Sequence, residues 1–155
     1  MGLDASVRCN CIKNGIAAPH PFPDLLRLDE TSEPILKGAD EMPLDIWLEH
    51  DLWFRRSCSH GGYLLQERLG NASLVGHIRS VMSAIPHDPY PVLQERVIHS
   101  GVHAGDFIRA EVSVRLLEEA QRLRQLSNDA ILQQFAADLI ELAETSVATG
   151  NPIVF

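Results

Sequence analysis

All three cysteines of the chain fall into two short pairs, and their placement constrains the fold more than any other feature. Cys9 and Cys11 are separated by one residue near the N-terminus, and Cys58 stands two positions before His60. Thiolate and imidazole are the ligands that zinc prefers in a closed structural tetrahedron. If the four side chains hold one ion, segments about fifty positions apart must lie together, and the ion closes a long loop.

The residues around the second pair suit a metal site. Gly61 and Gly62 follow directly, and glycines allow a sharp turn whose amides can donate to thiolate sulfurs. The arginines at 55–56 precede Cys58, where positive charge lowers a thiol pKa. We therefore predict a structural zinc site formed by Cys9, Cys11, Cys58 and His60.

Two other interpretations of the cysteines remain open at this point. Free cysteine often packs as a small apolar side chain, so the set can also be three buried thiols and a surface histidine. Alternatively, Cys9 and Cys11 form a redox pair. The single-residue spacer would strain such a disulfide, and we rank this interpretation last.

The hydrophobic pattern predicts strands near both ends and in the middle of the chain. Leu3, Ala5 and Val7 alternate with polar residues in the same parity as both N-terminal cysteines, which predicts a strand over 3–11 with one buried face. A strand is also expected over 92–98, before a glycine-rich turn, and a β-like tail after Gly150.

The remaining segments predict helices and one long excursion. Apolar stripes predict helices over 43–54, 61–86, 109–126 and 128–148, with Asp40 capping the first and a break at Gly70–Asn71 as an alternative within the second. The proline-rich residues 16–43 should form an ordered excursion. We predict one α+β domain over residues 1–155, helix-rich, with a small β-sheet and three to four helices.

Composition narrows the classes of function. With 45% hydrophobic residues, the chain should fold, and no apolar run approaches the ~20 residues that span a bilayer. Asp4 and Arg8 interrupt the N-terminus, so we expect no signal peptide, no membrane association and a cytoplasmic location. The net charge of −8 argues against nucleic acid and is compatible with a protein partner; the oligomeric state stays open.

A second cluster of polar residues occurs in "HSGVHAGDF", where His99, His103 and Asp106 follow a predicted strand. Loops of this kind often carry catalytic residues, which makes a metal-dependent hydrolase using this loop the alternative function. No H-E-x-x-H helix is present, however. We favour a tight loop in which Asp106 caps the following helix and the histidines bond to the backbone.

Four short motifs, "MGLDASVRCNC", "SCSHGGY", "SGVHAGDFI" and "ATGNPIVF", extend over nearly the whole chain. In them the sequence resembles a group of small uncharacterised bacterial proteins that begin with MGLD, carry an early C-x-C and end in a Pro-Ile tail. The resemblance implies a free-standing bacterial domain and carries over no catalytic residue.

Together these observations favour a non-enzymatic cytoplasmic protein that contains a structural zinc site and acts through protein–protein contacts. An immunity-type protein or a small regulatory subunit would fit the size, the acidity and the absence of a catalytic motif.

Overall fold

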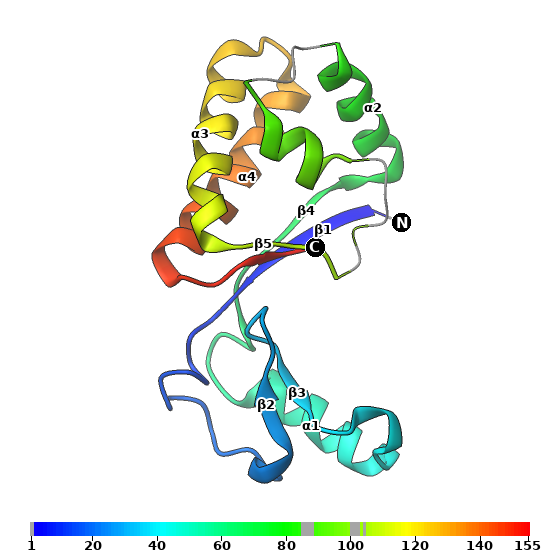
Figure 1. Ribbon diagram of the computed structural model, residues 1–155, viewed down its shortest axis with the longest axis vertical. Coiled ribbons are helices and arrows are strands. Elements are labelled where there is room, and N and C mark those ends of the chain that lie inside the picture. The colour runs from blue at the N-terminus through cyan, green and yellow to red at the C-terminus, as the bar shows by residue number, and fades with distance from the viewer. Residues whose placement is uncertain (1, 85–88, 100–102, 104) are drawn as a thin grey trace.

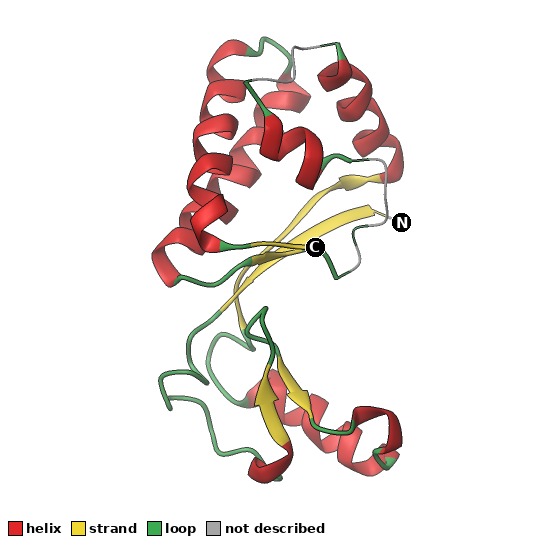
Figure 2. Cartoon of the chain, in the orientation of Figure 1, coloured by secondary structure: helices red, strands yellow, loops and turns green. Residues whose placement is uncertain are grey.

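A computed structural model of the protein describes residues 2–84, 89–99, 103 and 105–155. Helices and strands mix in an α+β arrangement that is rich in helix, as predicted (Figures 1 and 2). The strands are β1 (Gly2–Arg8), β2 (Leu26–Leu28), β3 (Pro34–Leu36), β4 (Tyr63–Asn71), β5 (Phe107–Ile108) and β6 (Ile153–Val154). The helices are η1 (Pro23–Leu25), η2 (Ala39–Glu41), α1 (Leu44–Arg56), α2 (Ala72–Ser83), η3 (Leu93–Val97), α3 (Ala110–Leu126) and α4 (Ala130–Thr149).

The body of the molecule is an antiparallel sheet packed against helices. Among the described residues the sheet has the strand order β4-β1-β6-β5, and α2, α3 and α4 cover one of its faces (Figure 2). The apolar core lies between these two layers and is built by β1, β4, β6, η3 and the three helices. Both ends of the described chain lie in this body (Figure 1). No helix in the described part of the chain has the length and apolarity to cross a bilayer.

The prediction of helix after Gly62 is wrong for residues 63–71, which form β4. This strand pairs with β1 along nearly its whole length, and its burial alternates with a period of two residues. The proposed break at Gly70–Asn71 marks the actual change of structure, because Asn71 ends the strand and caps α2 by accepting the amide of Leu74. Backbone pairing with β1 therefore outweighs the local helical pattern.

The predicted strand over 92–98 is wrong as well, because residues 93–97 form η3, a short π-helix. The physical cause lies on α3. Glu119 is buried there, and its carboxylate accepts the amides of Val92 and Leu93 at 3.1 and 2.9 Å. This contact satisfies the first amides of the short helix and fixes its start.

Residues 9–62, which we call the connecting segment, join β1 to β4 and extend away from the body (Figure 1). The segment contains the β2–β3 hairpin and α1, and the predicted excursion over 16–43 carries η1, the hairpin and η2. Asp40 lies in η2 and does not cap α1, whose N-cap is Pro43. No member of the apolar core cluster comes from this segment, whose buried apolar side chains are Cys9, Cys11, Pro34 and Leu36.

A buried amide joins the connecting segment to the end of α4. Asn151 is fully buried, and its Nδ2 donates to the carbonyl oxygen of Arg8 at 2.8 Å and to Oδ1 of Asn10 at 2.9 Å. Its Oδ1 accepts from Lys13 and from Ser32. One amide side chain thus ties β1 and two turns of the connecting segment to the C-terminal part of the chain.

Candidate metal centre

The two cysteine pairs lie where the connecting segment leaves the body and returns to it. β1 ends at Arg8, so Cys9 and Cys11 follow the strand and lie in the turn after it, not on a strand face as the alternation predicted. Cys58 and His60 stand between α1 and β4. Because Arg8 pairs with Tyr63 across the sheet, β1 and β4 place the two pairs side by side.

The four predicted ligand atoms converge on one point. The Sγ atoms of Cys9 and Cys58 are 3.7 Å apart, and Sγ of Cys11 lies 3.2 Å from Nδ1 of His60. All four atoms fall within 4.8 Å of one another. Zinc–sulfur bonds of about 2.3 Å in a tetrahedron imply sulfur–sulfur distances of about 3.8 Å, so the spacing suits a single ion.

Two glycines form the turn that carries Cys58 and His60. Gly61 and Gly62 have φ values of 58° and 90°, which favour glycine, and a Cβ at Gly62 would lie 2.3 Å from the ring of Phe54. The amides of His60 and Gly62 donate to the sulfur of Cys58. The glycine pair therefore has the role expected from the sequence.

The thiols of the cluster differ in acidity. Burial alone would raise the pKa of Cys58, but the amides of Gly62 and His60, together with the neighbouring thiols, lower this pKa to about 7. Burial and the thiols of Cys9 and Cys58 raise the pKa of Cys11 to about 12. A second and third thiolate at this place therefore need a cation, because three negative sulfurs in contact repel one another.

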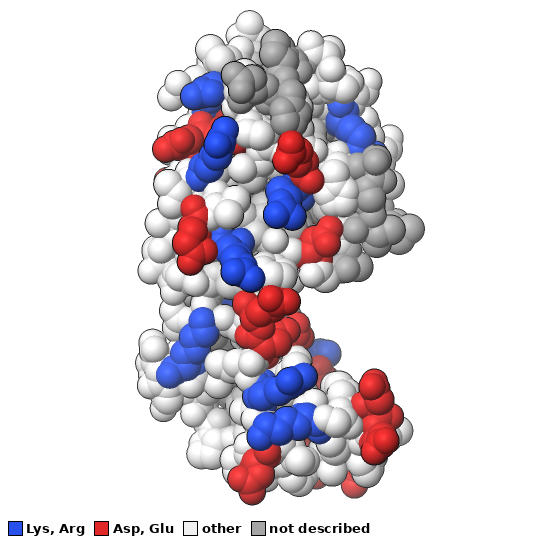
Figure 3. Space-filling view, in the orientation of Figure 1, with Lys and Arg blue, Asp and Glu red and all other residues white. Residues whose placement is uncertain are grey.

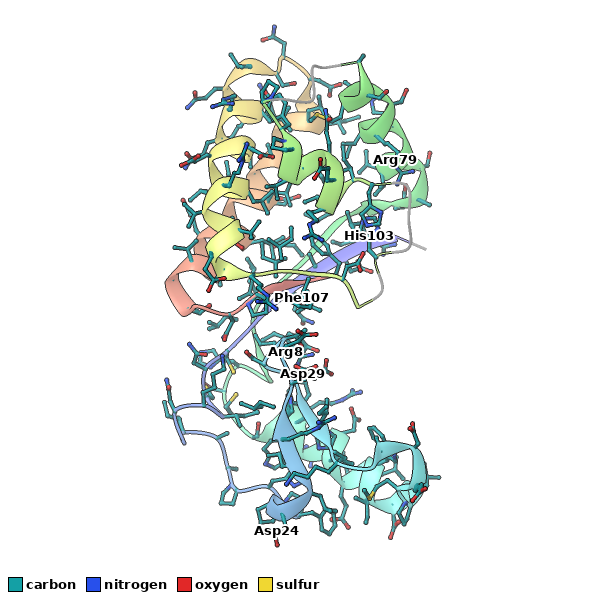
Figure 4. All side chains as sticks on the ribbon, in the orientation of Figure 1. Arg8, Asp24, Asp29, Arg79, His103 and Phe107 are labelled. Atoms are coloured by element: carbon teal, nitrogen blue, oxygen red, sulfur yellow. The ribbon has the colours of Figure 1, made fainter. Side chains whose placement is uncertain are left out.

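The arginines around the cluster are arranged differently from the prediction. Arg55 is exposed and pairs with Asp51 at 3.1 Å, so the low pKa of Cys58 comes from backbone amides instead. Arg8 lies at the junction between body and connecting segment (Figure 4). It is buried against the rings of Phe54 and Tyr63 and pairs with Glu33 at 2.8 Å. Sequence reasoning missed this role, because Arg8 has the outward parity of the strand.

The second predicted cluster lies in the body, where Figure 4 shows His103 near Arg79. Nε2 of His99 lies 3.2 Å from Oδ2 of Asp106, and the ring centroids of His99 and His103 are 4.1 Å apart with the rings tilted by 33°. Burial, then the neighbouring His99, lowers the pKa of His103. Asp106 does not cap a helix as predicted, because Phe107 and Ile108 form β5 and α3 begins four residues after Asp106, with Arg109 as its N-cap.

This histidine loop borders a cavity of about 440 Å³, which is also lined by Arg96 and Arg109. In the part of the chain that the structure describes, however, only the cysteine cluster brings together three or more metal-ligating atoms. Residues 100–102 and 104 of the loop lie outside the described residues. The hydrolase interpretation stays a prediction.

Two buried histidines, His20 and His50, form a contact that the sequence did not predict. Nε2 of His20 lies 3.0 Å from Nδ1 of His50, and Nδ1 of His20 accepts the amide of Phe22 at 2.9 Å. Trp53 packs edge-on against His20. Burial, then His20, lowers the pKa of His50. No motif or spacing links positions 20 and 50, and only the fold brings them together.

Comparison with known proteins adds no relative: no family model, no curated protein and no solved structure matches the chain.

Proposed function

We propose that the protein is a non-catalytic cytoplasmic bacterial protein in which a structural zinc ion holds the connecting segment in place and that acts through contacts with other protein chains. The observation that carries the proposal is the convergence of Cys9, Cys11, Cys58 and His60 from the two ends of one segment. Three thiolates and one imidazole fill all four positions of a zinc tetrahedron. Such a set leaves no open position for water or substrate, as catalytic zinc requires.

The composition of the connecting segment supports a structural role for the ion. A segment of this length with so few buried apolar side chains gains little from the hydrophobic effect. Small units of this kind are commonly stabilised by a metal or by disulfides. The zinc would do here what an apolar core does in the body.

The surface is compatible with protein contacts. On the face shown in Figure 3, acidic and basic side chains are interspersed, with one group of acidic side chains near the middle. Such a surface, together with the net charge of −8, gives no platform for a phosphate backbone. An immunity-type or a regulatory role would use a surface of this kind.

Metal content tests the proposal directly. Protein purified without added metal should contain one equivalent of zinc by elemental analysis, and Cys9→Ser or Cys58→Ser should lose it. Ser59→Ala is the matched control, because Ser59 lies between two ligands, is exposed and offers no sulfur. Metal-free protein whose three thiols all react quickly while the fold persists would refute the zinc site.

A further inference from the structure

One face of α1 is apolar and exposed. Leu44, Leu48 and Leu52 follow one another at four-residue spacing, so they form a single stripe along the helix. Their exposed fractions are 73%, 57% and 50%. We call these three residues the leucine stripe. Trp47, which is 38% exposed, lies next to it.

The opposite face of the same helix makes the contacts that hold α1 in the molecule. His50 is buried there, and Trp53 and Phe54 are half-buried. Trp53 donates to the carbonyl oxygen of Ala18, and His50 contacts His20. The helix is therefore fixed by one face, while the leucine stripe points outward.

Charges at the two ends of the stripe have opposite signs. Asp40, Glu41 and Asp45 lie at the N-terminal end of α1, and Arg55 and Arg56 form its last turn. All five of these residues are exposed. The stripe thus runs from an acidic end to a basic end, with Leu48 midway between Leu44 and Leu52.

We propose that the leucine stripe is a self-association surface on which a second copy of this chain packs with its α1 antiparallel. A two-fold axis at Leu48 would set Leu48 against its own copy and Leu44 against Leu52 of the partner subunit. The same operation brings the acidic end of each helix to the basic end of the other. A parallel arrangement would instead bring like charges together.

The symmetry of the stripe favours a second copy over an unrelated protein. A two-fold interface uses one patch twice, so that patch must be complementary to itself. The leucines are spaced symmetrically about the middle one, and the charges at the two ends of α1 have opposite signs. The stripe is therefore complementary to a second copy of itself in both shape and charge. A helix of 13 residues is about 20 Å long, and an interface built on it falls near the small end of the range for specific contacts, below about 1,200 Å². The association should therefore be weak and depend on concentration.

This inference rests on the proposed function only in naming the kind of protein that is contacted. It does not depend on the identity of the ion. Metal content, measured on the same samples, separates the two: a protein that keeps its zinc and never associates would refute the self-association surface alone.

Sedimentation at increasing protein concentration, with full metal content, is the test. The parent chain should form a dimer that weakens as salt is raised, because the charged ends are exposed. Leu48→Glu and Leu48→Lys should each be monomeric, since the two-fold axis places like charges in contact. A mixture of these two variants should associate again, because Glu then meets Lys at the axis.

Leu126→Glu is the matched control, because Leu126 is 71% exposed at the end of α3, away from the stripe. It should associate like the parent chain. Circular dichroism and melting temperature establish that all variants are folded, and Leu48→Gln, which adds no charge, should weaken the dimer less than Leu48→Glu. A monomeric parent at its highest soluble concentration, dimers that persist in both charged variants, or a mixture that stays monomeric would each overturn the proposal.

Discussion

Removing the metal should lower the stability of the whole protein, and the structure allows the size of the effect to be estimated. In the folded chain the sheet already holds the ligand pairs together, because Arg8 and Tyr63 are partners in the β1–β4 register. In the unfolded chain the ion must bring together Cys9 and Cys58, which are 49 positions apart. Closing a loop of that length costs about 4 kcal/mol in chain entropy.

The unfolded chain should therefore bind the ion about a thousandfold more weakly than the folded chain. By linkage, the same difference is the stabilisation that the ion contributes to the folded state, about 4 kcal/mol. For a chain of 155 residues this corresponds to a shift in melting temperature on the order of 10 °C.

The assay is thermal unfolding followed by circular dichroism, before and after removal of the metal with a strong chelator. The chelated protein should melt on the order of 10 °C lower, and re-addition of zinc should restore the original curve. Cys11→Ser should melt like the chelated protein, whereas Ser59→Ala should melt like the parent chain. An unchanged curve after verified metal removal would refute the linkage argument.

Four further predictions concern other parts of the molecule. Asn151→Ala should lower the free energy of unfolding in urea by about 3 kcal/mol, because a buried side chain that makes four hydrogen bonds is lost; a change under about 1 kcal/mol would contradict this. Glu119→Gln should lower the free energy of unfolding by about 2 kcal/mol in the same assay, because the Glu119 carboxylate accepts two amides at the start of η3. An unchanged urea midpoint would contradict this capping role. Burial and His20 lower the pKa of His50, so below about pH 6.5 the folded state takes up fewer protons than the unfolded state, and stability should fall as the pH drops further. In melting curves recorded at several pH values, His50→Gln should show a smaller fall in melting temperature than the parent chain. The same fall in both proteins would contradict this role of His50. His99→Ala should be as inactive as the parent chain in a broad hydrolase screen of the metal-loaded proteins, and parent activity that this variant loses at unchanged melting temperature would support the hydrolase instead.

Features governed by neighbouring residues could be predicted from the sequence. The helices expected over 109–126 and 128–148 are α3 and α4, with ends that differ by one or two residues. Asp129 caps α4 by accepting the amides of Ile131 and Leu132, and an aspartate directly before an apolar run is a common signal for the start of a helix. The convergence of the two cysteine pairs was also expected. Few residue types bind zinc, and all the cysteines of the chain fall into these two short pairs.

Features governed by distant partners could not be predicted. Residues 63–71 contain good helix formers, and they become a strand because β1, about sixty positions away in sequence, offers a full set of backbone partners. The period of α1 identified it as a helix, but period alone does not say which face is covered. The face with His50 is the covered one because His20 bonds to it, and the predicted apolar face is therefore left exposed.

The position of the metal centre connects the stability of the connecting segment with the placement of α1. Cys58 follows the end of α1 by two residues, and Cys9 follows the end of β1 directly. An ion shared by these residues would couple the C-terminal end of α1 to the sheet, while the His20–His50 contact holds the middle of the helix. Since the segment has almost no apolar core, an ion bound there would act together with the polar contacts to fix where α1 lies. The contacts of two thiols and two histidines would then determine that the leucine stripe of α1 faces outward. In this way the connecting segment can hold an exposed helix in one orientation although it has few buried apolar side chains.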